Sequence, residues 1–143
     1  MTGPELPRAI ALVTAQAALP NASGNLTLVE VGNLALTWEF PNALPPFVVV
    51  AILVGGRPGV VYTTRFQIVG PSGEVLGDVA GGDAPFTTQI TRVNVLQGLS
   101  DIAPGPVVQG AGIYTIRLLV NGTQVQETDL DIRAVPPPAL PTS

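Results

Sequence analysis

Few side chains in this sequence could support acid–base, nucleophilic or metal chemistry. The chain has no His and no Cys, all six of its basic residues are Arg, and its ten carboxylates are scattered. General acid–base catalysis near neutral pH usually relies on a His, on a carboxylate with a raised pKa or on a Lys with a lowered pKa. Without Cys, the chain also lacks a disulfide framework, a thiol nucleophile and the ligands of a Cys-based zinc site. We therefore expect a protein that is not an enzyme, with no catalytic residue, metal site or cofactor.

Two pairs of carboxylates could supply oxygen ligands to a hard cation. Asp129 and Asp131 alternate on one face of the last predicted strand, and Asp78 and Asp83 flank Gly81-Gly82. Calcium usually takes six to eight oxygen ligands, and neither pair has a third ligand beside it. The first pair is more typical of a solvated or edge-blunting strand face, and the second of a turn. Cation binding by Asp129 and Asp131 stays open as the alternative.

Three further motifs are better explained by structure than by chemistry. Ser72, in Gly70-Pro71-Ser72-Gly73, lacks the spacing of a nucleophile elbow and a His base. No predicted helix follows Gly110-Ala111-Gly112, so this segment is not a phosphate cradle. Tyr114 begins a predicted strand, where a Tyr hydroxyl often bonds back to the preceding loop. Trp38 is expected to fill the core.

The composition indicates an interaction surface. Charged residues make up 11% of the chain and the mean hydropathy is +0.44, whereas about 25% charged residues is usual. Large exposed apolar patches mark interaction sites, so we expect copies of the chain or another protein to cover much of this surface. The alternative is a thermophile-like monomer with a neutral Thr/Gln/Gly surface. The net charge of −4 and the absence of an Arg run argue against nucleic acid, and the apolar runs are too short to span a membrane.

The hydrophobic pattern predicts strands and no helix. Apolar and β-branched runs separated by Gly, Pro and Asn indicate strands at residues 8–19, 25–31, 34–40, 47–54, 60–69, 74–76, 86–96, 113–120 and 123–133. Asn121-Gly122 lies between the last two and is the strongest hairpin signal, because both central residues of such a turn need a positive φ. The segments 77–85 and 97–112 are expected to be loops.

These elements predict an all-β fold, an antiparallel β-sandwich or jelly-roll-like barrel. Residues 8–133 form the sandwich domain. Residues 1–7 are expected to be an extended N-terminal arm, and residues 134–143, which hold four prolines, an extended Pro-rich C-terminal tail.

The strand from Phe47 to Val54 is apolar on both faces, which is unusual in an antiparallel sandwich. A second apolar face suggests that another subunit or segment lies against it. Together with the two Pro-containing ends, this strand defines the expected interface: Pro4, Leu6, Pro7, Phe47, Val49, Ala51, Leu53, Pro136, Pro137 and Leu140.

Several stretches resemble a bacterial and phage family of β-sandwich domains of unknown function. They are Ala15 to Leu28 with Gly24-Asn25-Leu26, Phe40-Pro41 to Val50, Val69-Gly70-Pro71-Ser72-Gly73, and Gly112-Ile113-Tyr114-Thr115-Ile116 through Asn121-Gly122. This resemblance implies a fold and no activity.

The whole pattern resembles the decoration (auxiliary, cement) proteins of tailed-phage capsids, particularly those of thermophilic siphoviruses. The similarity lies in a β-sandwich between a Pro-containing arm and a Pro-rich tail, in a chain without Lys, His or Cys. It implies a thermostable homotrimer in the virion that binds the major capsid protein on the outer capsid surface and stabilises the shell. The alternative is a bacterial β-sandwich module that binds a ligand or a protein through the loops at 77–85 and 97–112.

Overall fold

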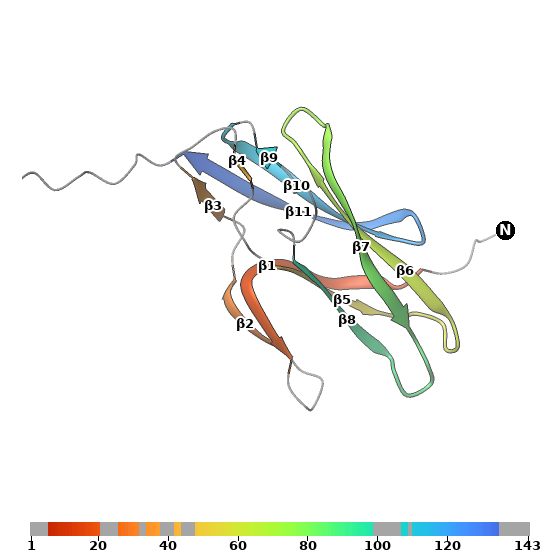
Figure 1. The fold of residues 1–143 in the computed structure, drawn as a ribbon. Helices are drawn as coiled ribbons and strands as arrows, with labels where there is room; N and C mark the ends of the chain where they lie inside the picture. Colours follow the sequence, from red (N-terminus) through yellow and green to blue (C-terminus); the bar gives the residue numbers. More distant parts are fainter. Residues whose placement is uncertain are drawn as a thin grey trace, which may run out of the picture.

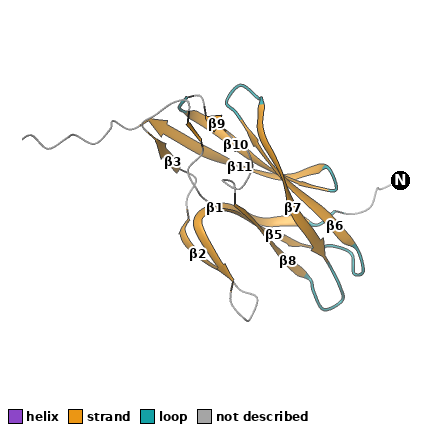
Figure 2. Ribbon diagram, in the orientation of Figure 1, coloured by secondary structure: helices purple, strands orange, loops and turns teal. Residues whose placement is uncertain are grey.

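The computed structural model describes residues 6–20, 26–31, 34–37, 42–43, 48–98, 107–108 and 110–134. Within these ranges the chain forms strands and loops and no helix (Figure 2). The strands are β1 (Arg8–Pro20), β2 (Leu26–Val31), β3 (Leu34–Thr37), β4 (Asn42–Ala43), β5 (Val48–Val54), β6 (Val61–Val69), β7 (Val75–Pro85), β8 (Arg92–Gly98), β9 (Val107–Val108), β10 (Gly112–Val120) and β11 (Thr123–Ala134).

The strands form two main sheets that face each other (Figure 1). One has four strands in the order β2-β1-β5-β8, and the other has five in the order β3-β11-β10-β6-β7. Strands β4 and β9 make a separate two-stranded sheet. Neighbouring strands are antiparallel except for β3, which runs parallel to β11. The predicted all-β antiparallel sandwich is confirmed.

The core lies between the two sheets and follows from strict alternation along the strands. On β6, Tyr62, Thr64 and Phe66 are buried, whereas Thr63 and Arg65 between them are exposed. Such alternation places one face of a strand against the opposite sheet. The largest fully buried side chains come from both sheets and from the residue that follows β7. They are Tyr62, Phe66, Phe86, Leu53, Ile68, Ile116, Leu118, Leu130, Ile132 and Val49, together with Val50 on the other face of β5.

The predicted hairpin between β10 and β11 is confirmed. Asn121 has a φ of 49° and Gly122 a φ of 81°, as a tight two-residue hairpin turn requires. Asn121 also ties the turn to β6, because its backbone N–H donates to the Thr63 carbonyl at 2.9 Å and its Oδ1 accepts from the Thr63 N–H at 2.9 Å. The turn is therefore held by side-chain chemistry as well as by backbone conformation.

Predicted boundaries were wrong at three places. The segment 97–112, expected to be a loop, contains the end of β8 and the whole of β9. The segment 77–85, expected to be a loop, belongs to β7, which pairs with β6 over its whole length. The strand expected at 86–96 begins only at Arg92, because Thr87 closes a turn before it. The Thr87 N–H donates to the Ile90 carbonyl at 3.0 Å, and its Oγ1 accepts from the Ile90 N–H at 2.8 Å. Trp38, the arm at 1–5 and the tail at 135–143 lie outside the described residues.

Candidate functional site

Three of the expected interface residues belong to the core of the single chain. Val49, Ala51 and Leu53 on β5 are each 0% exposed and pack between the two sheets. Their side chains face the opposite sheet, so no partner can reach them, and this corrects their assignment to an interface. The apolar character of that face of β5 reflects the sandwich itself.

The other face of β5 is also apolar. Val50 is 1% exposed, and Val48, Ile52 and Val54 are half-buried. Val50 pairs with Val13 on β1 and with Leu96 on β8. These three side chains form an apolar row across the outer face of the four-stranded sheet. The second apolar face predicted for this strand is therefore present.

The remaining expected interface residues divide into two groups. Leu6 is half-buried and packs against the core, and Pro7 is buried. The others lie outside the described residues: Pro4, Phe47, Pro136, Pro137 and Leu140.

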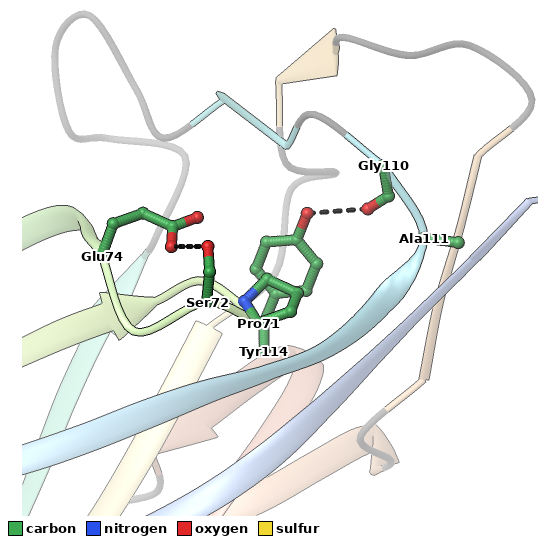
Figure 3. A pocket seen from close by; sticks show the side chains of 6 residues that line it. All are labelled: Pro71, Ser72, Glu74, Gly110, Ala111 and Tyr114. Atoms are coloured by element: carbon green, nitrogen blue, oxygen red, sulfur yellow. Dashed lines mark hydrogen bonds between the residues drawn. The ribbon is translucent and has the colours of Figure 1, made fainter.

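A shallow hollow of about 420 Å³ opens where the β6–β7 turn meets the start of β10 (Figure 3). It is lined by Pro71, Ser72, Glu74, Gly110, Ala111 and Tyr114. The turn is closed by two backbone hydrogen bonds, from the Gly70 N–H to the Glu74 carbonyl at 2.8 Å and from the Gly73 N–H to the Gly70 carbonyl at 3.0 Å. Gly73 has a φ of 93°, which a residue with a side chain rarely adopts. The wall of the hollow is thus a structured turn.

Tyr114 forms the opposite wall and has the structural role predicted for it. Its side chain is 2% exposed, and its hydroxyl donates to the Gly110 carbonyl at 2.7 Å (Figure 3). A buried Tyr hydroxyl that bonds a few residues upstream fixes the entry of the chain into its strand, as in the tyrosine corner of immunoglobulin-type sandwiches. The interaction holds Gly110 and Ala111 in place beside the hollow.

Ser72 and Glu74 interact at the rim of the hollow. The Ser72 hydroxyl donates to Glu74 Oε2. This hydrogen bond stabilises the ionised carboxylate and lowers the pKa of Glu74 below its ordinary value. A lowered pKa makes Glu74 a weaker base, so the pair favours electrostatic attraction of a cationic group over proton abstraction.

Two of the four carboxylates considered as cation ligands, Asp78 and Asp131, form ion pairs with Arg residues. Asp78 lies on β7, where it forms an ion pair with Arg65 at 3.0 Å. Asp131 Oδ2 contacts Arg133 Nη2 at 2.8 Å. Asp129 precedes Asp131 on the same outer face of β11. Asp83 stands opposite Thr63 on the edge strand β7. In the part of the chain that the structure describes, no group of three or more His, Cys, Asp or Glu side chains is arranged to hold a metal ion.

Large hydrophobic side chains are exposed on both sheets and on one connecting turn. Ile10, Leu19, Val61, Val75, Ile90 and Ile113 are 45% to 57% exposed. Ile10 is exposed because the pairing of β1 with β5 skips a residue between Ala9 and Ala11, and the extra residue of a bulge is turned out of the regular ladder. These six side chains are spread over β1, β6, β7, β10 and the turn before β8.

The motifs that form both walls of the hollow stand out in the sequence, but their proximity was not predicted. The Gly-Pro-Ser-Gly turn and the Gly-x-Tyr start of β10 are far apart in the sequence and meet only because β6 and β10 pair. One sequence signal could have indicated it: each motif is a turn, and both turns lie at the same end of two neighbouring strands. The described residues include no helix with the length and hydropathy needed to cross a membrane.

Comparison with known proteins gives structural similarities only. No protein family model and no curated protein matches the chain. One similar solved structure is the alkylpurine DNA glycosylase AlkC of Pseudomonas fluorescens bound to DNA containing an abasic site analogue, at 13% identity and a TM-score of 0.46 over 71% of this chain. The chain spans only 28% of the length of that glycosylase. Another is an immunoglobulin-like protein from Pseudomonas aeruginosa, at 13% identity and a TM-score of 0.44 over 92% of this chain and 100% of that one.

Proposed function

We propose that this chain is a structural assembly protein: a homotrimeric decoration protein that binds the major capsid protein on the outer surface of a phage capsid and stabilises the shell. The observation that carries the proposal is the exposure of six large hydrophobic side chains, each close to half exposed, on a chain with only 11% charged residues. Covering apolar area releases about 25 cal/mol per Å². A surface of this kind gains stability when protein covers it.

The sandwich suits such a role because its turns are internally fixed. Asn121 ties the β10–β11 turn to β6, and Tyr114 ties the start of β10 to Gly110. A rigid scaffold loses little conformational entropy when it binds, and this favours tight association. In the proposal, residues 1–7 and 134–143 add contacts to neighbouring subunits.

Co-sedimentation with capsid shells tests the proposal directly. Shells assembled from the major capsid protein of a thermophilic tailed phage are mixed with the purified chain, and the bound fraction and the shell melting temperature are measured. We expect saturable binding and a rise in shell melting temperature. An Ile113→Ser, Val75→Ser variant, which removes two exposed apolar side chains, provides the comparison and should bind more weakly. Absence of binding at micromolar concentration would refute capsid decoration.

The hollow supports a second candidate, a module that binds a small cationic ligand. Its rim carries the ionised Glu74 carboxylate and its wall is fixed by Tyr114. Titration with an alkylamine or a Lys-containing peptide should then shift NMR signals of Gly70 to Glu74 and of Gly110 to Tyr114, and Glu74→Gln should abolish the shifts. An unchanged spectrum at millimolar ligand would exclude this function.

A further inference from the structure

The six Arg residues fall into two classes by their partners. Arg65, Arg117 and Arg133 contact carboxylates on the five-stranded sheet, at 3.0, 3.9 and 2.8 Å. The other three, Arg8, Arg57 and Arg92, are exposed, and within the described ranges none of them forms an ion pair. Three guanidinium groups are therefore available to a partner.

These three Arg residues gather at one end of the four-stranded sheet. Arg8 on β1 and Arg92 on β8 both stand opposite Val54 on β5. Residues directly opposite each other project to the same face, and two strand spacings separate the two Cα atoms by roughly 10 Å. Arg57 lies in the turn that follows Val54.

Exposed apolar side chains accompany these charges. Ile10, on the bulge two residues after Arg8, is 53% exposed, and Ile90, two residues before Arg92, is 45% exposed. We call these five residues, Arg8, Ile10, Arg57, Ile90 and Arg92, the basic patch. Apolar groups beside unpaired charges form the kind of surface that binds a partner of opposite sign.

The five-stranded sheet has the opposite charge. All six carboxylates whose side chains are described lie on this sheet or in its β6–β7 turn: Glu74, Asp78, Asp83, Glu127, Asp129 and Asp131. Its three Arg residues leave a net charge of −3, which equals in size the +3 of the basic patch.

Part of this negative charge forms a stripe on β11. Glu127, Asp129 and Asp131 alternate along the strand and so share its outer face. Opposite Asp131 on β10 stands Ile113, which is 50% exposed. We call these four residues, Ile113, Glu127, Asp129 and Asp131, the acidic patch. Arg117 and Arg133 form ion pairs with Glu127 and Asp131, so within the described ranges the net charge here is −1 and Asp129 carries the unpaired carboxylate. Like the basic patch, the acidic patch has exposed apolar surface beside charge.

We propose that copies of this chain associate head to tail, with the basic patch of one copy on the acidic patch of the next. The two patches lie on different sheets, since β1 and β8 belong to the four-stranded sheet and β10 and β11 to the five-stranded sheet (Figure 1). One copy can therefore use both patches at once. Contacts between two different surfaces are heterologous, and they close into a ring when the rotation between copies permits. This deepens the proposed function by naming the surfaces through which a homotrimer meets.

The test measures self-association by analytical ultracentrifugation across a concentration series at 0.05 M and 1 M salt. The Debye length falls from more than 10 Å to about 3 Å over this range, so association through the patches should weaken markedly at high salt. Two charge-reversed variants carry the argument: Arg8→Glu with Arg92→Glu, and Glu127→Arg with Asp129→Arg. Each alone should weaken association by roughly 100-fold, the order expected when like charges face each other.

Mixing the two variants separates direct pairing of the patches from damage to the fold of either variant. A reversed basic patch is complementary to a reversed acidic patch, so the mixture should regain association as pairs of unlike copies. A closed ring of three is not expected from the mixture, because it would place two copies of one variant side by side. Arg65→Glu and Asp83→Arg serve as matched controls outside both patches and should associate like the unmodified chain. The milder pair Arg8→Gln with Arg92→Gln should weaken association in the same direction, and a melting temperature within a few degrees shows that each variant is folded.

Three results would overturn the inference: a monomer at every concentration and salt, association that neither reversal weakens, or reversed variants that mixing fails to restore. A monomer that still co-sediments with capsid shells would refute this inference and the trimer, and leave the proposed capsid binding standing. A salt-sensitive oligomer that ignores the shells would do the reverse.

Discussion

Removing the hydroxyl of Tyr114 tests whether this residue anchors the start of β10. In Tyr114→Phe the ring still fills its buried position, where the side chain is 2% exposed, but the 2.7 Å hydrogen bond to the Gly110 carbonyl is lost. A hydrogen bond contributes a net stability of about 1 kcal/mol, and the half-buried Gly110 carbonyl left without its donor adds to the loss. We expect the free energy of unfolding to fall by about 1 to 2 kcal/mol in total.

The assay is urea denaturation followed by fluorescence or circular dichroism. The midpoint should fall while the slope stays the same, because the area exposed on unfolding hardly changes. At about 3 to 4 °C per kcal/mol for a domain of this size, the melting temperature should fall by roughly 3 to 8 °C. Amide exchange at Ala111 and Gly112 should also become faster. A change in stability below about 0.3 kcal/mol with unchanged exchange would show that the hydroxyl does not anchor the strand.

Three further substitutions follow from the same structure. Gly56→Ala should destabilise the fold by roughly 1 to 3 kcal/mol, because the new Cβ would collide with the Phe86 ring, and denaturant unfolding measures the loss. Asn121→Ala should cost about 1 to 2 kcal/mol, because Ala tolerates a φ of 49° poorly and lacks the Oδ1 that accepts hydrogen bonds from Thr63 on β6. Equal stability would contradict this view of the turn. Ser72→Ala should raise the pKa of Glu74 toward its ordinary value, as an NMR titration can show. Since the native pKa is lowered, the interaction stabilises the fold above the ordinary carboxyl pKa and is lost as the pH falls through the lowered value.

Local signals predicted the parts of the fold that local chemistry determines. The Asn121-Gly122 turn and the backward hydrogen bond of Tyr114 each depend on a few adjacent residues, so the sequence contains all the information needed. Most of β7, residues 77–85, was missed for the opposite reason. Its glycines and aspartates favour a loop, and it is a strand because it pairs with the strongly patterned β6.

The site was harder to predict, because it depends on which strands become neighbours. Val49, Ala51 and Leu53 were expected to face a partner, whereas the opposite sheet of the same chain covers them. A count of apolar faces along one strand cannot distinguish an intramolecular neighbour from another subunit. The sequence also does not show which Arg residues form ion pairs. Arg8 and Arg92 lie on either side of Val54 only because β1 and β8 both pair with β5.

The irregular edge formed by β7 has a consequence for contacts between copies of this chain. This strand ends the five-stranded sheet, its pairing with β6 shifts register twice, and it carries Asp78, Asp83 and a terminal Pro85. Bulges, charges and proline on an edge strand all obstruct the addition of a further strand. Crowded copies therefore cannot extend this edge into a continuous intermolecular sheet, the route by which many β-proteins form fibrils. At this edge, contact between molecules is restricted to side chains, where it stays reversible and selective.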